Sequence, residues 1–148
     1  PNGAGKTTLV NVLSGFQRPQ GGRVTLDGAE VGGRGSEWLA RAGVVRSFQA
    51  VRLFPALTVA ENVEAALAAR GLGRFAARRR GREMLDGLGL GARAHLPARA
   101  LSYGDERRVG IARALALAPR FLLLDEPAAG MNVAEAEALS QLIRRIRD

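Results

Sequence analysis

Apolar residues recur every three to four positions in several parts of the chain, and this spacing predicts α-helices with one apolar side. In residues 9–16 it places Leu9, Val12 and Leu13 on one side of a short helix. The same spacing predicts helices over residues 36–43, 58–70, 75–88, 102–118 and 133–148, with Gly81 weakening the one at 75–88. The stripe on the last helix has five members: Ala136, Leu139, Leu142, Ile143 and Ile146.

Polar residues mark where three of these helices begin. Thr58 and Glu61 form a capping box, in which the Thr58 hydroxyl accepts a hydrogen bond from the Glu61 amide while Glu61 reaches back. Ser102 and Asn132 each precede a helical pattern and are residue types that cap helix N-termini. The sequence therefore predicts helix starts at Thr58, near Ser102 and after Asn132.

Strand patterns lie on both sides of the helical stretch. Alternating residues over 21–28 predict a short strand that ends in an Asp27-Gly28 turn, and residues 43–48 predict a second strand. The continuous apolar run at 121–124 is typical of a buried parallel strand. Strands at both ends with helices between them predict an α/β core that holds an inserted helical subdomain.

Composition limits the class of protein. A chain of 148 residues with 47% apolar and 24% charged residues is typical of one soluble globular domain. No apolar run approaches the ~18 residues of a membrane span, and no leader pattern is present, so we expect a soluble chain that is not exported. With no cysteine and one histidine, His95, any metal must be held by oxygen ligands.

The net charge of +8 would also suit a nucleic-acid or membrane-surface partner. The arginines are spread along the chain, however, and no aromatic residues alternate with them at regular spacing. A solvated arginine-rich surface is the simpler interpretation, and we expect no nucleic-acid partner.

The opening residues, PNGAGKTT, match the end of a P-loop. Gly3 and Gly5 can turn backbone amides toward a phosphate, and the helix that follows offers its N-terminus to the same anion. Lys6, the one lysine among 22 basic residues, would reach the β and γ phosphates, and Thr7 would place its hydroxyl on Mg²⁺. The alternative is a glycine-rich turn with an incidental lysine. The first glycine of the motif would precede Pro1, so we expect the sequence to be part of a longer protein.

Two adjacent carboxylates follow the apolar run at 121–124. Asp125 and Glu126 stand where an open α/β sheet binds ligands, at the carboxyl end of a strand. Because successive residues point to opposite sides, the two carboxylates have different predicted roles. Asp125 would serve the Mg²⁺ shell and Glu126 would polarise the attacking water. The alternative is a solvated strand end.

Four motifs in order, the P-loop, SFQ at 47–49, LSYGD at 101–105 and LLLDEP at 122–127, resemble the nucleotide-binding subunits of ATP-binding cassette (ABC) transporters. The resemblance implies a P-loop NTPase core, with a mixed sheet flanked by helices, and an ABC-type helical subdomain. Residues 1–48 and 119–148 would form the core, and residues 49–118 the Q-loop and helical subdomain, together an incomplete cassette. It also implies ATP and Mg²⁺ as ligands. The P-loop contacts would be Asn2, Gly3, Ala4, Gly5, Lys6, Thr7 and Thr8.

By the same resemblance, Ser102 and Gly104 belong to a signature loop that caps the ATP of a second subunit in a head-to-tail dimer. Ser102 would cap its own helix as well. Gln49 matches the Q-loop glutamine, a catalytic and metal contact that also senses the permease; the alternative is an exposed loop amide. Tyr103 and Asp105 depart from the commonest signature, and Asn132 replaces the usual aspartate of the D-loop. An aspartate next to a phosphate is unfavourable because both are negatively charged, unless its side chain points away. Whether Asp105 makes the ATP contact that the family assigns to this position therefore stays open.

Two family features have no counterpart in these residues, the aromatic residue that stacks on adenine and the switch histidine. His95 precedes the signature and is interpreted as a surface loop residue. The amino-acid sequence of residues 46–63 and 101–132 looks most like that of the ATPase subunits of branched-chain amino acid importers. Those subunits are peripheral proteins on the cytoplasmic face of the bacterial inner membrane. Their partners are permease subunits and, indirectly, a periplasmic binding protein.

Other functions remain as alternatives. Within the family these are an ATPase for urea or short amides, or for lipopolysaccharide export. A soluble ABC ATPase that acts on nucleic acid or the ribosome is another, although such proteins usually join two cassettes or carry long insertions. A nucleotide-binding module without hydrolysis is countered by Glu126.

Apolar residues without a strand or helix pattern lie at 49–55, namely Val51, Leu53 and Phe54. They could plug the core. Alternatively, they line a groove that receives a cytoplasmic helix of the permease, with Arg52 at the rim.

Overall fold

The computed structural model describes residues 5–47 and 52–147. Within these residues the chain begins with helix α1 (Lys6–Leu13), strands β1 (Thr25–Leu26) and β2 (Ala29–Glu30), helix α2 (Ser36–Arg41) and strand β3 (Val44–Ser47). Helices α3 (Val59–Ala69), α4 (Arg74–Gly87) and α5 (Tyr103–Ala116) follow, with two 3₁₀ turns at Gly91–Arg93 and Ala98–Ala100. Strand β4 (Phe121–Leu124) and helix α6 (Val133–Arg147) complete the order.

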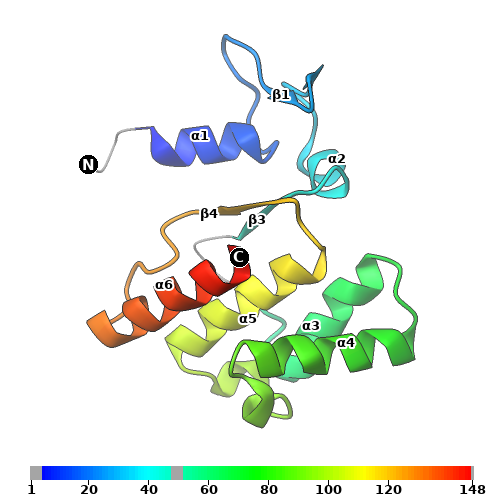
Figure 1. Cartoon of the computed structure of the whole chain (residues 1–148), viewed down its shortest axis with the longest axis vertical. Helices are drawn as coiled ribbons and strands as arrows, with labels where there is room; N and C mark the ends of the chain where they lie inside the picture. Colours follow the sequence, from blue (N-terminus) through cyan, green and yellow to red (C-terminus); the bar gives the residue numbers. More distant parts are fainter. Residues whose placement is uncertain (1–4, 48–51, 148) are drawn as a thin grey trace.

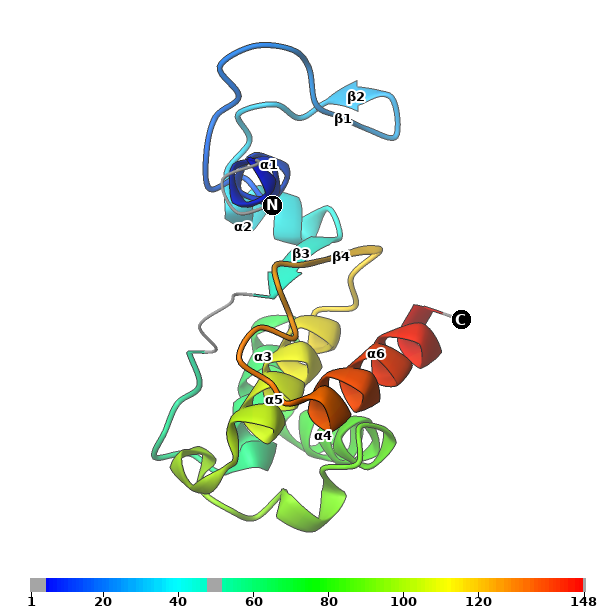
Figure 2. The ribbon, with the colours of Figure 1, turned by 90° about the vertical axis from the view of Figure 1, so that its left-hand side faces the viewer.

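Strands β3 and β4 form a parallel pair in the middle of the molecule. The register joins Val44 to Phe121 and Ser47 to Leu124, so both strands end at the same edge. Helix α1 lies on one side of this pair, and helices α3 to α6 lie on the other (Figure 1). The view turned by 90° keeps the same separation (Figure 2). The parallel strand predicted before Asp125 is therefore confirmed.

The strand predicted over residues 21–28 is one half of a hairpin. β1 and β2 pair antiparallel, with Thr25 opposite Glu30 and Leu26 opposite Ala29. Asp27 and Gly28 both have positive φ, 52° and 79°, as a tight hairpin turn of the I′ type requires. Arg120 holds the turn to the start of β4 through bonds of 2.6 and 2.9 Å to the Asp27 carboxylate. These bonds lower the pKa of Asp27.

The main hydrophobic core lies among the helices that follow β3. Its fully buried members include Val59, Val63, Leu85, Leu90 and Val109, which come from α3, α4, α5 and the turn after α4. Leu139 and Leu142 of α6 complete it, and Ile143 and Ile146 pack on its edge. The apolar stripe predicted for the last helix is thus the face that covers this core.

Gly81 contributes to the packing of α3 against α4. It is buried, and a Cβ at this position would lie 3.4 Å from Glu64 Cγ and 3.7 Å from Leu67 Cδ1. The glycine therefore allows the two helices to approach closely. Its effect on the helix prediction was overestimated, because tertiary contact outweighs the low helix propensity of one glycine.

The extent of the first helix and the burial of β4 differ from their predictions. Helix α1 ends at Leu13, before the predicted Phe16, because Gly15 takes a positive φ of 76°. None of its residues is buried among the described part of the chain, and Leu9 is 59% exposed. In β4, Phe121 is 47% exposed and Leu122 to Leu124 are half-buried, since β3 is the one strand paired with β4 in the described residues.

Candidate functional site

The helix predicted to follow the P-loop glycines begins at Lys6, three residues before the apolar pattern at 9–16. Gly5 is the N-cap of α1 and has a left-handed backbone, with φ 76° and ψ 7°. A residue with a side chain adopts these angles at a cost, so the position suits glycine. Lys6, Thr7 and Thr8 form the first turn and are exposed, and this turn carries no acidic residue. The N-terminal amides of α1 are thus available to an anion without a competing carboxylate.

Asp125 follows directly after β4 and is buried, with 6% of its side chain exposed. Its Oδ2 accepts a hydrogen bond of 2.9 Å from Nη2 of Arg46, a side chain that is itself 8% exposed. Nη1 of Arg46 donates to Oδ1 of Asn11 at 2.6 Å. The guanidinium therefore joins the carboxylate at the end of β4 to helix α1.

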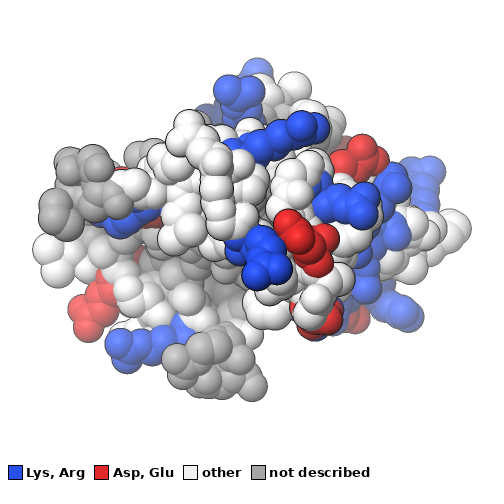
Figure 3. All heavy atoms as spheres, turned by 90° about the horizontal axis from the view of Figure 1, so that it is seen from above, with Lys and Arg blue, Asp and Glu red and all other residues white. Residues whose placement is uncertain are grey.

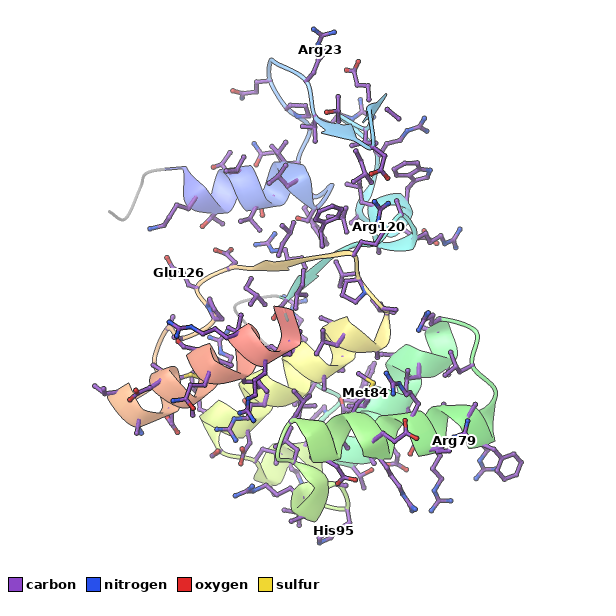
Figure 4. The ribbon with its side chains drawn as sticks, viewed as in Figure 1. Arg23, Arg79, Met84, His95, Arg120 and Glu126 are labelled. Atoms are coloured by element: carbon purple, nitrogen blue, oxygen red, sulfur yellow. The ribbon has the colours of Figure 1, made fainter. Side chains whose placement is uncertain are left out.

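Glu126 is exposed and lies where the chain leaves β4 (Figure 4). Its φ is 47°, one of three positive values among the described residues other than glycine. Such a backbone costs free energy in a residue with a side chain and often accompanies a functional position. Asp125 is buried while Glu126 is exposed, so the two carboxylates have different surroundings, as predicted. The reason differs from the predicted strand alternation, because β4 ends at Leu124 and the positive φ of Glu126 turns the chain.

The two sides of the predicted metal site face one cavity of about 840 Å³. Thr7 of α1 and Asp125 after β4 both line it. A hydroxyl and a carboxylate are the hard oxygen ligands that Mg²⁺ takes in company with substrate phosphates and water. Among the described residues no group of three His, Cys, Asp or Glu side chains is close enough to hold a metal. Thr7 and Asp125 therefore fit a Mg²⁺ ion that takes its other ligands from a phosphate and from water.

The predicted signature loop forms the start of α5. Ser102 is the N-cap, and its hydroxyl accepts from the Asp105 amide at 3.3 Å. The Asp105 carboxylate points toward Arg93, at 3.2 Å, and Arg108, at 3.9 Å. The negative charge of Asp105 is thus offset by these two arginines of the helical subdomain. Gly104 is buried, and a Cβ there would lie 3.1 Å from Glu135 Oε1.

Tyr103 connects the signature loop to the segment that follows Glu126. Its hydroxyl donates to the Ala129 carbonyl at 3.0 Å and accepts a hydrogen bond from Arg107. Its ring lies against Gly130, where a Cβ would be 3.3 Å from Tyr103 Cε1. The departure from the common signature at position 103 therefore adds a contact between two loops 26 residues apart.

Asn132 caps α6 as predicted. Its Oδ1 accepts from the Glu135 amide at 2.9 Å, and Glu135 Oε2 accepts from the Asn132 amide at 3.1 Å. His95 is exposed at the far end of the helical lobe, well away from Glu126, which agrees with its interpretation as a surface residue (Figure 4). Asn2, Gly3, Ala4, Gln49 and Val51 lie outside the described residues.

The segment predicted to line a groove divides into two parts. Leu53 is half-buried against the core, whereas Phe54 is 49% exposed and lines the same cavity as Thr7. Arg113 of α5 lies over the Phe54 ring at 5.1 Å and donates to the Arg52 carbonyl at 2.6 Å. Burial lowers the pKa of the Arg113 guanidinium. Leu53 therefore packs against the core, as the first interpretation of this segment predicts. Phe54 instead lines the cavity.

Three residues near the site were not found by sequence reasoning. Arg46 and Asn11 carry no motif of their own. Asn62 of α3 is fully buried; its side chain accepts from the Phe54 amide at 2.9 Å and donates to the Phe54 carbonyl at 3.1 Å. The sequence could have indicated Asn62 only through its position, because a polar residue on the apolar side of a helix suggests a buried, hydrogen-bonded side chain.

Lys and Arg occur over much of the face seen in Figure 3, and more of them lie toward its right-hand side. Asp and Glu lie among them.

A comparison with known families matches residues 1–129 to the family described as ABC transporter. This match covers most of the chain and includes the P-loop, the signature loop and the Asp125-Glu126 pair. The chain belongs to the ABC transporter family.

Curated ABC relatives include ATPases of several transporters. The high-affinity branched-chain amino acid transport ATP-binding protein LivG of Salmonella typhimurium is 42% identical over 100% of this chain and 64% of its own length. BraF of Pseudomonas aeruginosa, of the same description, is 43% identical over 99% of this chain. The methionine import ATP-binding protein MetN 1 of Rhodococcus jostii is 42% identical over 99% of this chain. The chain thus spans 64% of the length of LivG and BraF.

Solved ABC structures share the fold. The ADP conformation of an ATP-binding cassette of an ABC transporter superposes with a TM-score of 0.86 at 28% identity, covering 99% of this chain and 63% of that one. A dimeric cassette in a post-hydrolysis state, bound to ADP and Pi, gives a TM-score of 0.84 at 30% identity, covering 100% of this chain and 67% of that one. The predicted P-loop NTPase core with a helical subdomain is confirmed. No helix in the described part of this ABC chain combines the length and apolar character needed to cross a membrane.

Proposed function

We propose that this chain forms part of the ATP-hydrolysing subunit of an ABC importer for branched-chain amino acids. The observation that carries the proposal is the cavity that is lined both by Thr7, from the predicted P-loop helix, and by Asp125, directly after β4. The description of LivG and BraF supports the cargo. The identity of 42% to a methionine import ATPase keeps import of another small solute as the second candidate.

In the proposed site each residue has one task. Amides of residues 2–8 bind the phosphates, with the Lys6 ammonium neutralising the β and γ groups. Thr7, Asp125 and Gln49 would hold Mg²⁺, and the ion when bound would offset negative charge on the phosphates. Glu126, exposed and strained at the end of β4, accepts a proton from the attacking water and orients it.

The proposed site is completed by a second subunit. Ser102 and Gly104 lie at the N-terminus of α5, whose amides would bind an anion as those of α1 would. Unlike α1, the first turn of α5 carries Asp105 and Glu106, and Asp105 is paired with Arg93 and Arg108. One chain supplies both half-sites, so two chains arranged head to tail form two complete ATP sites. The dimeric cassette bound to ADP and Pi supports this arrangement.

The proposed permease contact uses the outer part of the same cavity. Alanines of α3, with Gly110 and Ala114 of α5, line it, and Phe54 and Arg52 stand beside them. Small side chains on two neighbouring helices leave room for a helix from a partner. This contact would place the subunit on the cytoplasmic face of the inner membrane, where a periplasmic binding protein communicates with it through the permease.

Glu126→Gln tests the hydrolytic role in the full-length gene product. The amide keeps the size of the side chain but cannot accept the proton, so ATP hydrolysis should fall by about 10²-fold while ATP still binds. Steady-state hydrolysis, nucleotide affinity and the monomer–dimer ratio with ATP are the measurements. Glu37→Gln on α2, which removes an exposed carboxylate paired with Arg41, is the matched control. Hydrolysis at the parental rate in Glu126→Gln would assign the base to another group.

The cargo is tested separately, with the permease and a binding protein reconstituted in vesicles. Leucine, isoleucine and valine should stimulate hydrolysis and enter the vesicles, and methionine and taurine should not. Stimulation by methionine alone would move the assignment to the second candidate without affecting the ATPase assignment.

A further inference from the structure

We infer that Arg46 and Asn11 form a strut that sets the geometry of the Mg²⁺ site, with Arg46 acting as a positioning residue for Asp125. The inference rests on the proposed nucleotide site and names residues that no motif assigns to it.

The strut connects the two sides of that site. Nη2 of Arg46 donates to Asp125 Oδ2 at 2.9 Å, and Nη1 donates to Asn11 Oδ1 at 2.6 Å. Both bonds come from one rigid, planar guanidinium, so the positions of Asp125 and Asn11 are fixed relative to each other. Arg46 also lies 5.8 Å from the centre of the Phe16 ring, just beyond the end of α1.

Asn11 lies four residues after Thr7 on α1, and residues at this spacing share one face of a helix. The side of α1 that Arg46 holds is therefore the side that carries the Thr7 hydroxyl. A bond to Asn11 sets the distance between Thr7 and Asp125, the two protein ligands proposed for the ion among the described residues.

The bond to Asp125 also restricts the orientation of the carboxylate. Because the guanidinium binds Oδ2, the carboxylate cannot rotate freely, and Oδ1 is the oxygen that can reach a metal ion or a metal-bound water. Partners that orient metal ligands in this way typically change metal affinity by about 10- to 100-fold when they are removed.

A strut of this kind should matter more for Mg²⁺ than for Ca²⁺. Mg²⁺ demands near-octahedral geometry at short distances, whereas Ca²⁺ accepts longer and more variable coordination. Loosening α1 relative to Asp125 should therefore weaken Mg²⁺ binding more than Ca²⁺ binding. A residue that only stabilises the fold would weaken both ions, and ATP itself, to the same extent.

The experiment measures ATP affinity of the full-length gene product by isothermal titration calorimetry in EDTA, in Mg²⁺ and in Ca²⁺. Arg46→Met keeps much of the side-chain length and removes both hydrogen bonds. It should leave ATP affinity in EDTA unchanged and lower the Mg²⁺-dependent gain by about tenfold. The Ca²⁺-dependent gain should fall less. Arg120→Met, which removes a guanidinium bound to Asp27 at the opposite end of β4, is the control and should change none of the three affinities.

Asn11→Ala keeps the buried charge pair and removes the other half of the strut, so it should reduce the Mg²⁺ gain in the same direction even if Arg46→Met fails to fold. Three results would contradict the proposed strut. They are an unchanged Mg²⁺-dependent gain in ATP affinity in both variants, a larger gain, or equal losses of ATP affinity in EDTA, Mg²⁺ and Ca²⁺. A parental protein without ATP binding in EDTA or Mg²⁺ would reject the proposed function itself.

Discussion

Lys6 shows how much one residue type can reveal at the scale of single residues. The chain uses arginine for every other cation, yet the first turn of α1 carries a lysine just after the left-handed Gly5. A compact ammonium can turn its three donors toward oxygens crowded into a loop, while a guanidinium is larger and fixed in its plane. The choice of residue therefore indicates the shape of the ligand as well as its charge.

Replacing Lys6 with alanine should weaken MgATP binding by about tenfold or more, because a hydrogen bond to a charged group contributes about 1.5–3 kcal/mol. Lys6→Arg keeps the charge and should still bind less tightly than the parent. Titration of a fluorescent ATP analogue measures both. Arg23→Ala, which removes an exposed charge near the hairpin, should bind as the parent does. Parental affinity in Lys6→Ala would reject the P-loop assignment.

Local signals made some residues of the site predictable. The bonds between Thr58 and Glu61, and between Asn132 and Glu135, span three residues, so the sequence contains both partners within one turn. The Arg46–Asp125 pair spans 79 residues, and the Arg120–Asp27 pair spans 93. Such pairs depend on how strands align, which no local pattern specifies. For that reason Arg46 was missed while Asp125 was found.

At the scale of elements, the position of the segment before α3 has a consequence for coupling. Asn62 holds the Phe54 backbone through two hydrogen bonds, and Arg113 covers one face of the ring. The ring is therefore held at the cavity while remaining 49% exposed. A fixed, exposed aromatic side chain is well suited to contact a partner helix.

Phe54→Ala should preserve basal ATP hydrolysis by the purified subunit and reduce substrate-stimulated hydrolysis in the assembled importer. Both rates, together with the melting temperature, are the measurements. Leu57→Ala changes an apolar residue of similar exposure in the same segment, outside the cavity lining, and should retain stimulation. Equal loss of both rates with a lower melting temperature would show that Phe54 only supports the fold.

Elements were predicted best where one segment contains its own pattern. The helices from residue 58 onward match their predictions because each has an apolar face, and α3, α5 and α6 also have a polar residue that caps the first turn. The burial of β4 was overestimated because an apolar run does not show how many neighbouring strands cover it. The second strand of the hairpin, β2, is two residues long, which is too short for any alternation to be seen.

At the scale of the whole molecule, the chain has two parts of unequal packing. The main core is built from residues of α3, α4, α5 and α6 with the turn after α4, whereas α1 buries none of its residues in the described structure. Stability should therefore be concentrated in the helical part, and the first 30 residues should open at lower free energy.

Leu85→Ala should lower the free energy of unfolding by about 2–5 kcal/mol, because it leaves a cavity in this core. Hydrogen exchange should show the loss in α3, α4 and α5 together and little change in α1. Phe75→Ala, on the same helix but 89% exposed, should change stability by less than about 0.5 kcal/mol. A loss of protection confined to α4 would mean that these helices do not unfold as one unit.

The exposed position of Lys6 also makes it a unique chemical handle. Within these 148 residues an amine-directed label has one side chain to modify, and a lysine-specific protease has one peptide bond to cut, after Lys6. Both reactions take place on the first turn of α1, where the proposed ligand binds. Occupancy of the phosphate site can therefore be followed by the protection of a single lysine side chain, without an engineered reporter.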